Sequence, residues 1–152
     1  MRLFIDLGRT MWYVLSDYAY NYHSSWVIKD CTPKKLYEQF HEDWLFSHTP
    51  FQWVYTFTPN VFWKFAYKIL QSQFWLLWVI QAVVEIDVDH KISELHVNKV
   101  ILWKWRPKKD EIIDLINNVS EDWVVIDNHD EADAYKLFLY VKWIHTWKIN
   151  DD

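Results

Sequence analysis

Four carboxylates and a histidine fall within seven positions near the end of the chain: Asp127, His129, Asp130, Glu131 and Asp133. Charges this close repel one another, so the segment costs free energy unless solvent or a cation offsets the repulsion. Asp130 and Asp133 are three residues apart and would share one face of a helix. Acids at a helix start can also act as caps or dipole partners, so the pair leaves two interpretations open, a cap and a cation site.

The other charged residues of this segment have weaker functional interpretations. His129 could assist proton transfer or be an exposed histidine in an acidic loop. Glu131 points a different way round the helix from Asp130 and Asp133, which predicts a solvated side chain. Asp127 precedes the helix and is a flanking acid.

A distant acid, Asp6, ends the apolar segment R-L-F-I-D two residues before Gly8, the only glycine. It is either a turn aspartate that bonds its own backbone or a metal ligand displayed at a strand end. Hard cations such as Mg²⁺ or Mn²⁺ take oxygen ligands, usually only a few carboxylates with waters. If Asp6, Asp130 and Asp133 converge at one sheet edge, two bound ions could activate a water and stabilise the leaving oxygen in phosphodiester cleavage.

The elements that would position these acids follow from pattern. Residues 2–6 and 11–15 predict a hairpin with a tight D-L-G-R turn, in which Gly8 is the one residue that fits. Further strands are predicted at 27–28, 51–57 and 95–102. Residues 124–126 either continue a strand or lead into the last helix.

Helices are predicted over four segments. Thr32 as N-cap and Pro33 at the first position start a helix that runs to residue 46. A long apolar helix covers 61–84, an amphipathic one 108–118, and the last helix 130–147. Strands followed by alternating helices and strands predict an α/β or mixed α+β sheet in a single domain over 1–152.

Composition bounds the class. Of 152 residues, 51% are hydrophobic and 24% charged, as in soluble globular proteins, but Trp 12 and Gly 1 are unusual and have no explanation in the pattern. The net charge of −5 argues against a nonspecific nucleic-acid coat. The distribution of charge still leaves a locally basic face open. The basic stretch 104–109 is either a solvated loop or a phosphate-binding segment, and five residues are the candidate phosphate contacts: Lys64, Lys104, Arg106, Lys108 and Lys109.

The lone Cys31 excludes an internal disulfide and favours a reducing compartment. The N-terminus does not read as a secretory signal, and the most apolar run, residues 74–80, is far shorter than the roughly 20 residues of a membrane span. We expect a protein of the cytoplasm, or of the host cytoplasm if it is viral, with no membrane partner.

The segments F-I-D-L-G-R-T-M-W-Y-V-L (4–15) and D-E-A-D-A-Y-K-L-F-L-Y (130–140) resemble the first strand and last helix of RuvC-type Holliday-junction resolvases, which read roughly I-D-x-G-x-x-x-T-G-W-A-V and D-x-x-D-A-L-A-L-A. The stretch R-P-K-K-D-E-I-I (106–113) is similar to the lysine-bearing helix entry of small phage members. The resemblance covers nearly the whole chain in order and spacing.

This resemblance implies an RNase H-like fold, a mixed five-stranded sheet flanked by helices. It implies a homodimer through the 61–84 helix and a Mg²⁺- or Mn²⁺-dependent endonuclease that resolves four-way or branched DNA with four carboxylates. Asp6, Asp130 and Asp133 match three of the acids. The fourth, a glutamate on a central strand, is replaced by Thr56, and no Asp or Glu lies between Asp43 and Glu85.

The chain also departs from the family's glycines, with Met11 at one such position and Trp103 and Trp105 in a glycine-rich region. Three alternatives remain. One is a non-catalytic junction- or partner-binding protein of the same fold. A HAD-type phosphatase would need an acid where Gly8 stands, and an actin-like ATPase would need a longer chain.

Overall fold

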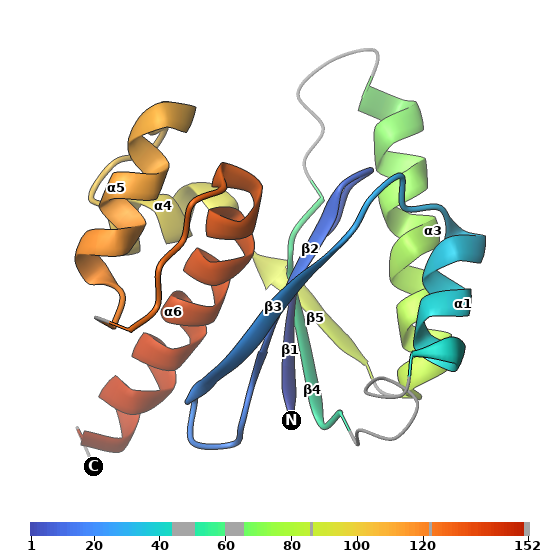
Figure 1. The fold of residues 1–152 in the computed structure, drawn as a ribbon, viewed down its shortest axis with the longest axis horizontal. Coiled ribbons are helices and arrows are strands. Elements are labelled where there is room, and N and C mark those ends of the chain that lie inside the picture. Colours follow the sequence, from blue (N-terminus) through green and yellow to red (C-terminus); the bar gives the residue numbers. More distant parts are fainter. Residues whose placement is uncertain (44–50, 60–65, 86, 122, 151–152) are drawn as a thin grey trace.

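A five-stranded mixed sheet forms the centre of the computed structural model, which describes residues 1–43, 51–59, 66–85, 87–121 and 123–150 (Figure 1). The strands lie in the order β3-β2-β1-β4-β5. The first three pair antiparallel, and β4 and β5 join parallel to β1. Their bounds are β1 Arg2–Asp6, β2 Met11–Ser16, β3 Tyr22–Ile28, β4 Trp53–Phe57 and β5 Val88–Ile92. The predicted five-stranded mixed sheet is confirmed.

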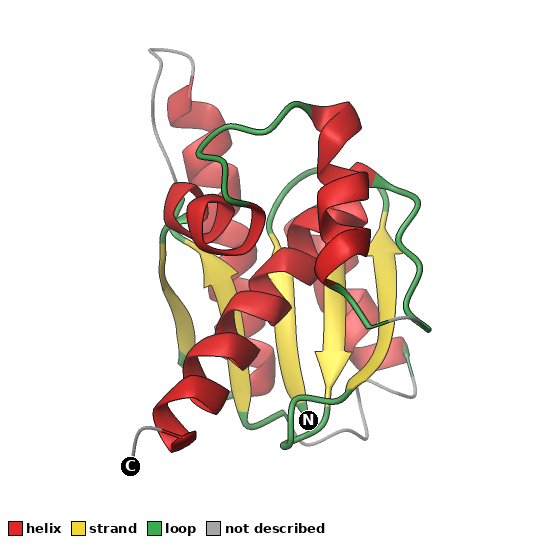
Figure 2. Cartoon of the chain, turned by 90° about the vertical axis from the view of Figure 1, so that its left-hand side faces the viewer, coloured by secondary structure: helices red, strands yellow, loops and turns green. Residues whose placement is uncertain are grey.

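Helices cover both faces of the sheet (Figures 1 and 2). Helices α1 (Pro33–Glu42) and α3 (Ala66–Val84) lie on one face, and α4 (Glu94–Leu102), α5 (Lys109–Val119) and α6 (His129–Asn150) lie on the other. Alternate residues of β1 face opposite ways: Leu3 and Ile5 join the core under α1 and α3, and Phe4 joins the core under α6. Burial on both faces fixes the register of β1, and with it the position of Asp6 at its end.

The connection after β1 differs from the predicted tight turn. Residues 7–10 form a four-residue loop, and Gly8 does not have a positive φ. A Cβ added at Gly8 would meet nothing closer than the Thr10 carbonyl oxygen at 3.8 Å, an ordinary contact. The prediction that only glycine fits there is therefore wrong, because the longer loop relieves the strain that a two-residue turn would impose.

The predicted strand over 95–102 is wrong as well, since this segment is helix α4. The Ser93 hydroxyl accepts a hydrogen bond from the His96 backbone N–H at 3.5 Å and caps the helix, while Val97 and Leu102 fill the core below α6. The last strand is instead β5, whose sequence V-D-H-K-I alternates buried Val88 with exposed Asp89 and Lys91. The strand was not predicted because its exposed side carries charged residues and only its other side is apolar.

The remaining predicted elements are close to the observed ones. Thr32 caps α1 by accepting a bond from the Lys35 N–H at 3.2 Å, and α5 follows the predicted 108–118 closely. The predicted start of the long helix at 61–65 lies outside the described residues. Residues 124–126 form no strand and lead into α6. Within the described residues, no helix is both long and apolar enough to cross a membrane.

Candidate active site

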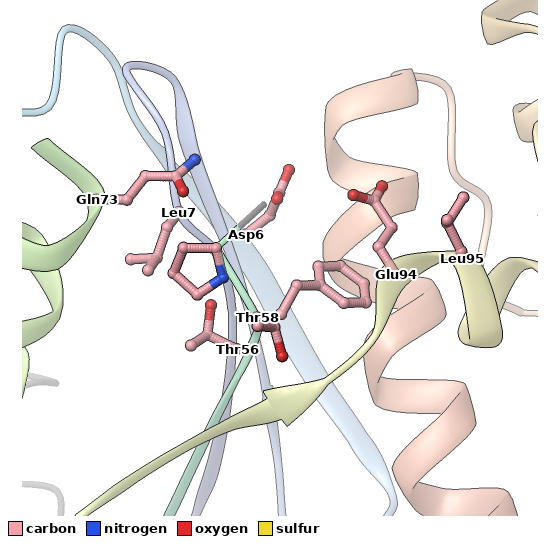
Figure 3. Close-up of a pocket in the computed structure, with 9 residues that line it drawn as sticks. Asp6, Leu7, Thr56, Thr58, Gln73, Glu94 and Leu95 are labelled. Carbon is pink, nitrogen blue, oxygen red and sulfur yellow. The ribbon is translucent and has the colours of Figure 1, made fainter. Parts of the chain in front are cut away.

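Asp6 ends β1 at a pocket of about 310 Å³ on one edge of the sheet (Figure 3). The pocket is lined by Asp6 and Leu7 at the end of β1, by Thr56 to Pro59 at the end of β4, by Glu94 and Leu95 at the start of α4, and by Gln73 of α3. Because β1, β4 and β5 run parallel, their carboxyl ends meet at this edge. Figure 3 shows Asp6, Thr56 and Glu94 around this pocket, with the Glu94 side chain coming from the start of α4.

Thr56 occupies the central-strand position at which the sequence lacks the expected acid. It pairs with Ile5 in the register of β1 and β4. By strand alternation Thr56 faces the α1/α3 side of the sheet, like Val54, whereas Asp6 faces the α6 side, like Phe4. Its side chain is buried, and its hydroxyl oxygen has no hydrogen-bond partner within the described structure. A buried hydroxyl without a partner costs free energy, so Thr56 is either a defect or a group that meets a ligand in the pocket.

Asp130 and Asp133 lie on the first turns of α6. The helix is capped by Asn128, whose side-chain oxygen accepts from the backbone N–H groups of Asp130 at 2.8 Å and Glu131 at 3.3 Å. Asn128, and neither aspartate, is therefore the cap, while Asp130 in the first turn still has the favourable helix-dipole position. Asp130 pairs with the His129 ring nitrogen at 3.2 Å, half exposed. Asp133 turns toward the sheet.

A lysine that the sequence reasoning passed over lies beside Asp133. The side chain of Lys136 is 1% exposed, and its Nζ donates to Asp133 Oδ1 at 2.7 Å and to Glu94 Oε1 at 2.9 Å. The same nitrogen lies 5.5 Å from the centre of the Phe57 ring. Lys136 therefore joins the α6 acid to the Glu94 carboxylate of the pocket.

The electrostatics show that these groups act on one another. Burial raises the pKa of Asp6 well above its ordinary value of 3.8, and the charges of Asp133, Glu94 and Asp130 raise it further, against the opposing effect of Lys136. Burial also raises the pKa of Asp133. Burial alone would lower the pKa of Lys136, but Asp133 and Glu94 outweigh it and hold the ammonium charged.

The structure thus places Asp130 and Asp133 within electrostatic reach of Asp6. It does not pack them into a ready-made cage: in the described part of the chain, no group of three or more His, Cys, Asp or Glu side chains could hold a metal ion unaided. Mg²⁺, however, is commonly held by one or two carboxylates together with waters and substrate phosphates. Asp6 and Glu94, the two carboxylates that line the pocket, are of the ligand type that such an ion takes.

Glu94 and Lys136 are the site residues that sequence reasoning missed. Lys136 had a signal, because it is a charge within the apolar run A-Y-K-L-F, three residues after Asp133, where the resembled motif has alanine. Glu94 had none, because its segment was predicted as a strand and its partner is 42 residues away.

The flanking acids have different surroundings from one another. Asp127 is exposed, as expected. Glu131 is not simply solvated, because its carboxylate accepts a hydrogen bond from the Ser25 hydroxyl of β3. This contact ties the start of α6 to the sheet, so the predicted solvation of Glu131 is wrong.

The basic segment between α4 and α5 remains mostly open to solvent. The Lys104 Nζ pairs with Glu111 at 2.6 Å, so the carboxylate offsets part of the positive charge that Lys104 could offer to a phosphate. Arg106, Lys108 and Lys109 are exposed and have no ion pair with a described residue. Lys64 lies outside the described residues.

Neither protein-family models nor curated sequences match the chain. Among solved structures, RuvC from Thermus thermophilus in complex with a Holliday junction substrate is similar with a TM-score of 0.66 at 12% identity, covering 93% of this chain and 94% of that one. A second Thermus thermophilus RuvC structure gives a TM-score of 0.62 at 10% identity, with 95% of both chains covered.

The chain has the RuvC fold. The RuvC likeness confirms the predicted RNase H-like architecture across nearly the whole length. At this identity the similarity concerns the fold alone, so activity has to be argued from the residues at the pocket.

Proposed function

We propose that the chain is a structure-selective endonuclease that hydrolyses phosphodiester bonds in branched DNA such as four-way junctions. One observation carries the proposal: Asp6, Glu94 and Asp133 come from three separate elements to one edge of a RuvC-fold sheet, with Asp130 beside them. Like charges gathered at such a cost are typical of sites that work on a charged substrate. Glu94 supplies the fourth carboxylate in place of Thr56.

The site would use one Mg²⁺ or Mn²⁺ ion, held by Asp6, Asp130 and Asp133 together with substrate phosphate. Such an ion lowers the pKa of a bound water and stabilises a leaving oxygen. Lys136 uses only Oδ1 of Asp133, which leaves Oδ2 as a ligand atom. Thr56 lines the same pocket, and its unpartnered hydroxyl would bond a water that entered beside it.

Phosphate contacts outside the pocket would come from Arg106, Lys108 and Lys109. These residues precede or begin α5, on the same side of the sheet as α6. Basic side chains fix the register of a duplex without reading its sequence, as a junction-selective enzyme requires.

A homodimer is part of this proposal. Two opposed strands of a junction need two active sites, and one side of α3 exposes Gln71, Ser72, Trp75 and Trp78. Sedimentation equilibrium tests the pairing, and a monomer at micromolar concentration in the presence of junction DNA would contradict it.

A second candidate is a protein that binds junctions without cutting them. Two observations favour it: Thr56 replaces an acid on β4, and Lys136 neutralises part of the remaining acids. Both candidates predict selective binding to a four-way junction over linear duplex, and they differ only in cleavage.

The deciding experiment is a nicking assay on a synthetic four-way junction with Mg²⁺ and with Mn²⁺. We expect nicks that are lost in Asp6→Asn and kept in Asp114→Asn, a matched change at an exposed acid of α5. Tight junction binding with no cleavage in either metal would favour the second candidate. Hydrolysis of a small phosphate ester that depends on Asp6 would instead favour a phosphatase.

A further inference from the structure

A positive charge is built into the carboxylate cluster. The Nζ of Lys136 lies between oxygens of Asp133 and Glu94, and its side chain is 1% exposed. The two acids come from different helices, so the lysine cross-links α6 to the start of α4. Burying an ammonium group is costly unless it is paired and hydrogen-bonded, and here it is both.

A second divalent ion at this site would meet a positive charge that is already bonded to two of the carboxylates. Lys136 takes one oxygen each from Asp133 and Glu94, and Thr56 offers no charge on β4. Resting on the proposed function, we propose that Lys136 is a tethered cation that takes the place of a second metal ion, so that the site binds a single divalent ion.

This role makes Lys136 a positioning residue. An ammonium group has three donor hydrogens, of which Asp133 and Glu94 use two. Its bond to Glu94 holds that carboxylate at the pocket. Glu94 thereby replaces the carboxylate that is missing because position 56 is a threonine.

The test is a Mn²⁺ titration by calorimetry in the absence of DNA, comparing the wild-type chain with Lys136→Met. We expect one ion in the wild type, and in the variant either a second ion or at least tenfold tighter binding. Lys142→Met is the matched control. Lys142 lies on the same helix, and its Nζ pairs with Glu121 Oε1 at a distance of 2.9 Å; neither residue lines the pocket. It should bind Mn²⁺ like the wild type.

Thermal melting with and without Mn²⁺ gives an independent readout. The melting temperature of Lys136→Met should rise with Mn²⁺ by more than that of the wild type. If Lys136→Met does not fold, the same measurements are made on the double variant Lys136→Met, Glu94→Gln, in which one of the two acids left without the lysine is neutral. Two ions bound by the wild type, or equal Mn²⁺ responses in all variants, would overturn the inference.

These measurements separate the inference from the proposed function, because they need neither DNA nor cleavage. A wild type that binds one ion and never nicks junctions would overturn the endonuclease and keep the tethered cation. Nicking by a wild type that binds two ions would do the reverse.

A different observation concerns tryptophan. The chain has Trp 12 and Gly 1, whereas a protein of this length carries about 11 glycines at average usage. Of the nine tryptophan side chains that the structure describes, none is buried, and eight are exposed. Tryptophan is normally among the most buried side chains on average, so this degree of exposure is unusual for an indole.

Trp103 gives the backbone evidence. It ends α4 with φ 61° and ψ 16°, in the left-handed region, and its side chain is 86% exposed. Helices commonly end in this conformation on glycine, and it is a genuine outlier for a bulky residue.

We infer that most tryptophan positions of this chain are glycine in the cells that naturally make it. A UGA codon, read as tryptophan under one genetic code and as glycine under another, would produce this pattern. Glycine at 103 and 105 would flank Lys104 and let the backbone of the basic segment approach a phosphate closely. The apolar groove that Trp103 and Trp143 line would then be absent from the natural protein.

The gene and the natural protein test this directly. We expect UGA rather than UGG at these codons, and peptides around residues 103–105 whose masses fit glycine. UGG codons or tryptophan-containing peptides would overturn the inference. In the recombinant chain, Trp103→Gly should raise the melting temperature and Trp103→Ala should raise it less, because alanine keeps the left-handed strain; an equal or greater rise with alanine would count against it.

Discussion

The Nζ of Lys136 lies 2.7 Å from Oδ1 of Asp133, one turn earlier on the same helix. The lysine also bonds Glu94 at 2.9 Å, so one buried charge links an acid of α6 with an acid at the start of α4. The stability of α4 against α6 and the charge of the pocket are therefore set by the same residue. This coupling makes the site testable through stability as well as through cleavage.

Replacing Asp6 with asparagine should stabilise the fold at neutral pH while abolishing nicking. Burial and neighbouring acids raise the pKa of Asp6, so folding works against its ionised form. The stability difference between Asp6→Asn and the wild type should be small near pH 3.8 and grow as pH rises toward the folded-state pKa. We expect a gain on the order of 1–3 kcal/mol at neutral pH, measured by urea unfolding.

The control for this prediction is Asp114→Asn, an exposed acid on α5. It should change the free energy of unfolding by less than about 0.5 kcal/mol at any pH. If Asp6→Asn destabilises the chain at neutral pH, the electrostatic cost assigned to Asp6 is wrong.

Lys136→Met should be strongly destabilising without metal. Removing one partner of a buried ion pair leaves uncompensated charge, which costs about 3–5 kcal/mol. Glu94→Gln should cost about 1 kcal/mol or less, because the Glu94 side chain is 41% exposed and Asp133 still pairs the lysine. A double-mutant cycle by chemical unfolding measures the coupling, and additive effects would show that the bond contributes little.

Thr56→Val should stabilise the chain by roughly 1 kcal/mol. The Thr56 hydroxyl is buried and has no partner in the described structure, and valine has nearly the same shape without the polar atom. Nicking should fall at the same time, since the proposed function gives this hydroxyl a water to hold. Unchanged cleavage alongside higher stability would mark Thr56 as a structural replacement with no part in the reaction.

Neutralising basic residues should weaken junction binding unequally. Removing a cation that touches a phosphate lowers the slope of log affinity against log salt by about 1. Alanine at Arg106, Lys108 or Lys109 should show this effect, whereas Lys104→Ala should show less because Glu111 already pairs that lysine. Lys34→Ala on α1, across the sheet, is the control. The affinities are measured by fluorescence anisotropy at several salt concentrations. If all variants show the same slope of log affinity against log salt, the DNA-binding surface lies elsewhere on the protein.

Much of the fold could be predicted from local pattern. The apolar segments before Asp6 and after Thr10 predict the hairpin, because a strand buried on both faces needs an unbroken apolar run. Thr32 before Pro33 marks a helix start that the structure confirms. The strand predicted at 95–102 is helix α4, and the strand is β5 before it. The prediction failed because the branched residues at 97–101 favour a strand, whereas the Ser93 cap and packing under α6 favour a helix.

The sequence by itself determined which acids are available and how two of them are arranged. Asp130 and Asp133 share a helix face through their spacing alone, and the absence of an acid on β4 is visible without coordinates. Only the tertiary structure decided that Glu94 reaches the pocket and that Lys136 is buried against it. That contact joins residues 42 positions apart, and no local periodicity encodes it, because it forms only when α4 and α6 pack on the same face of the sheet.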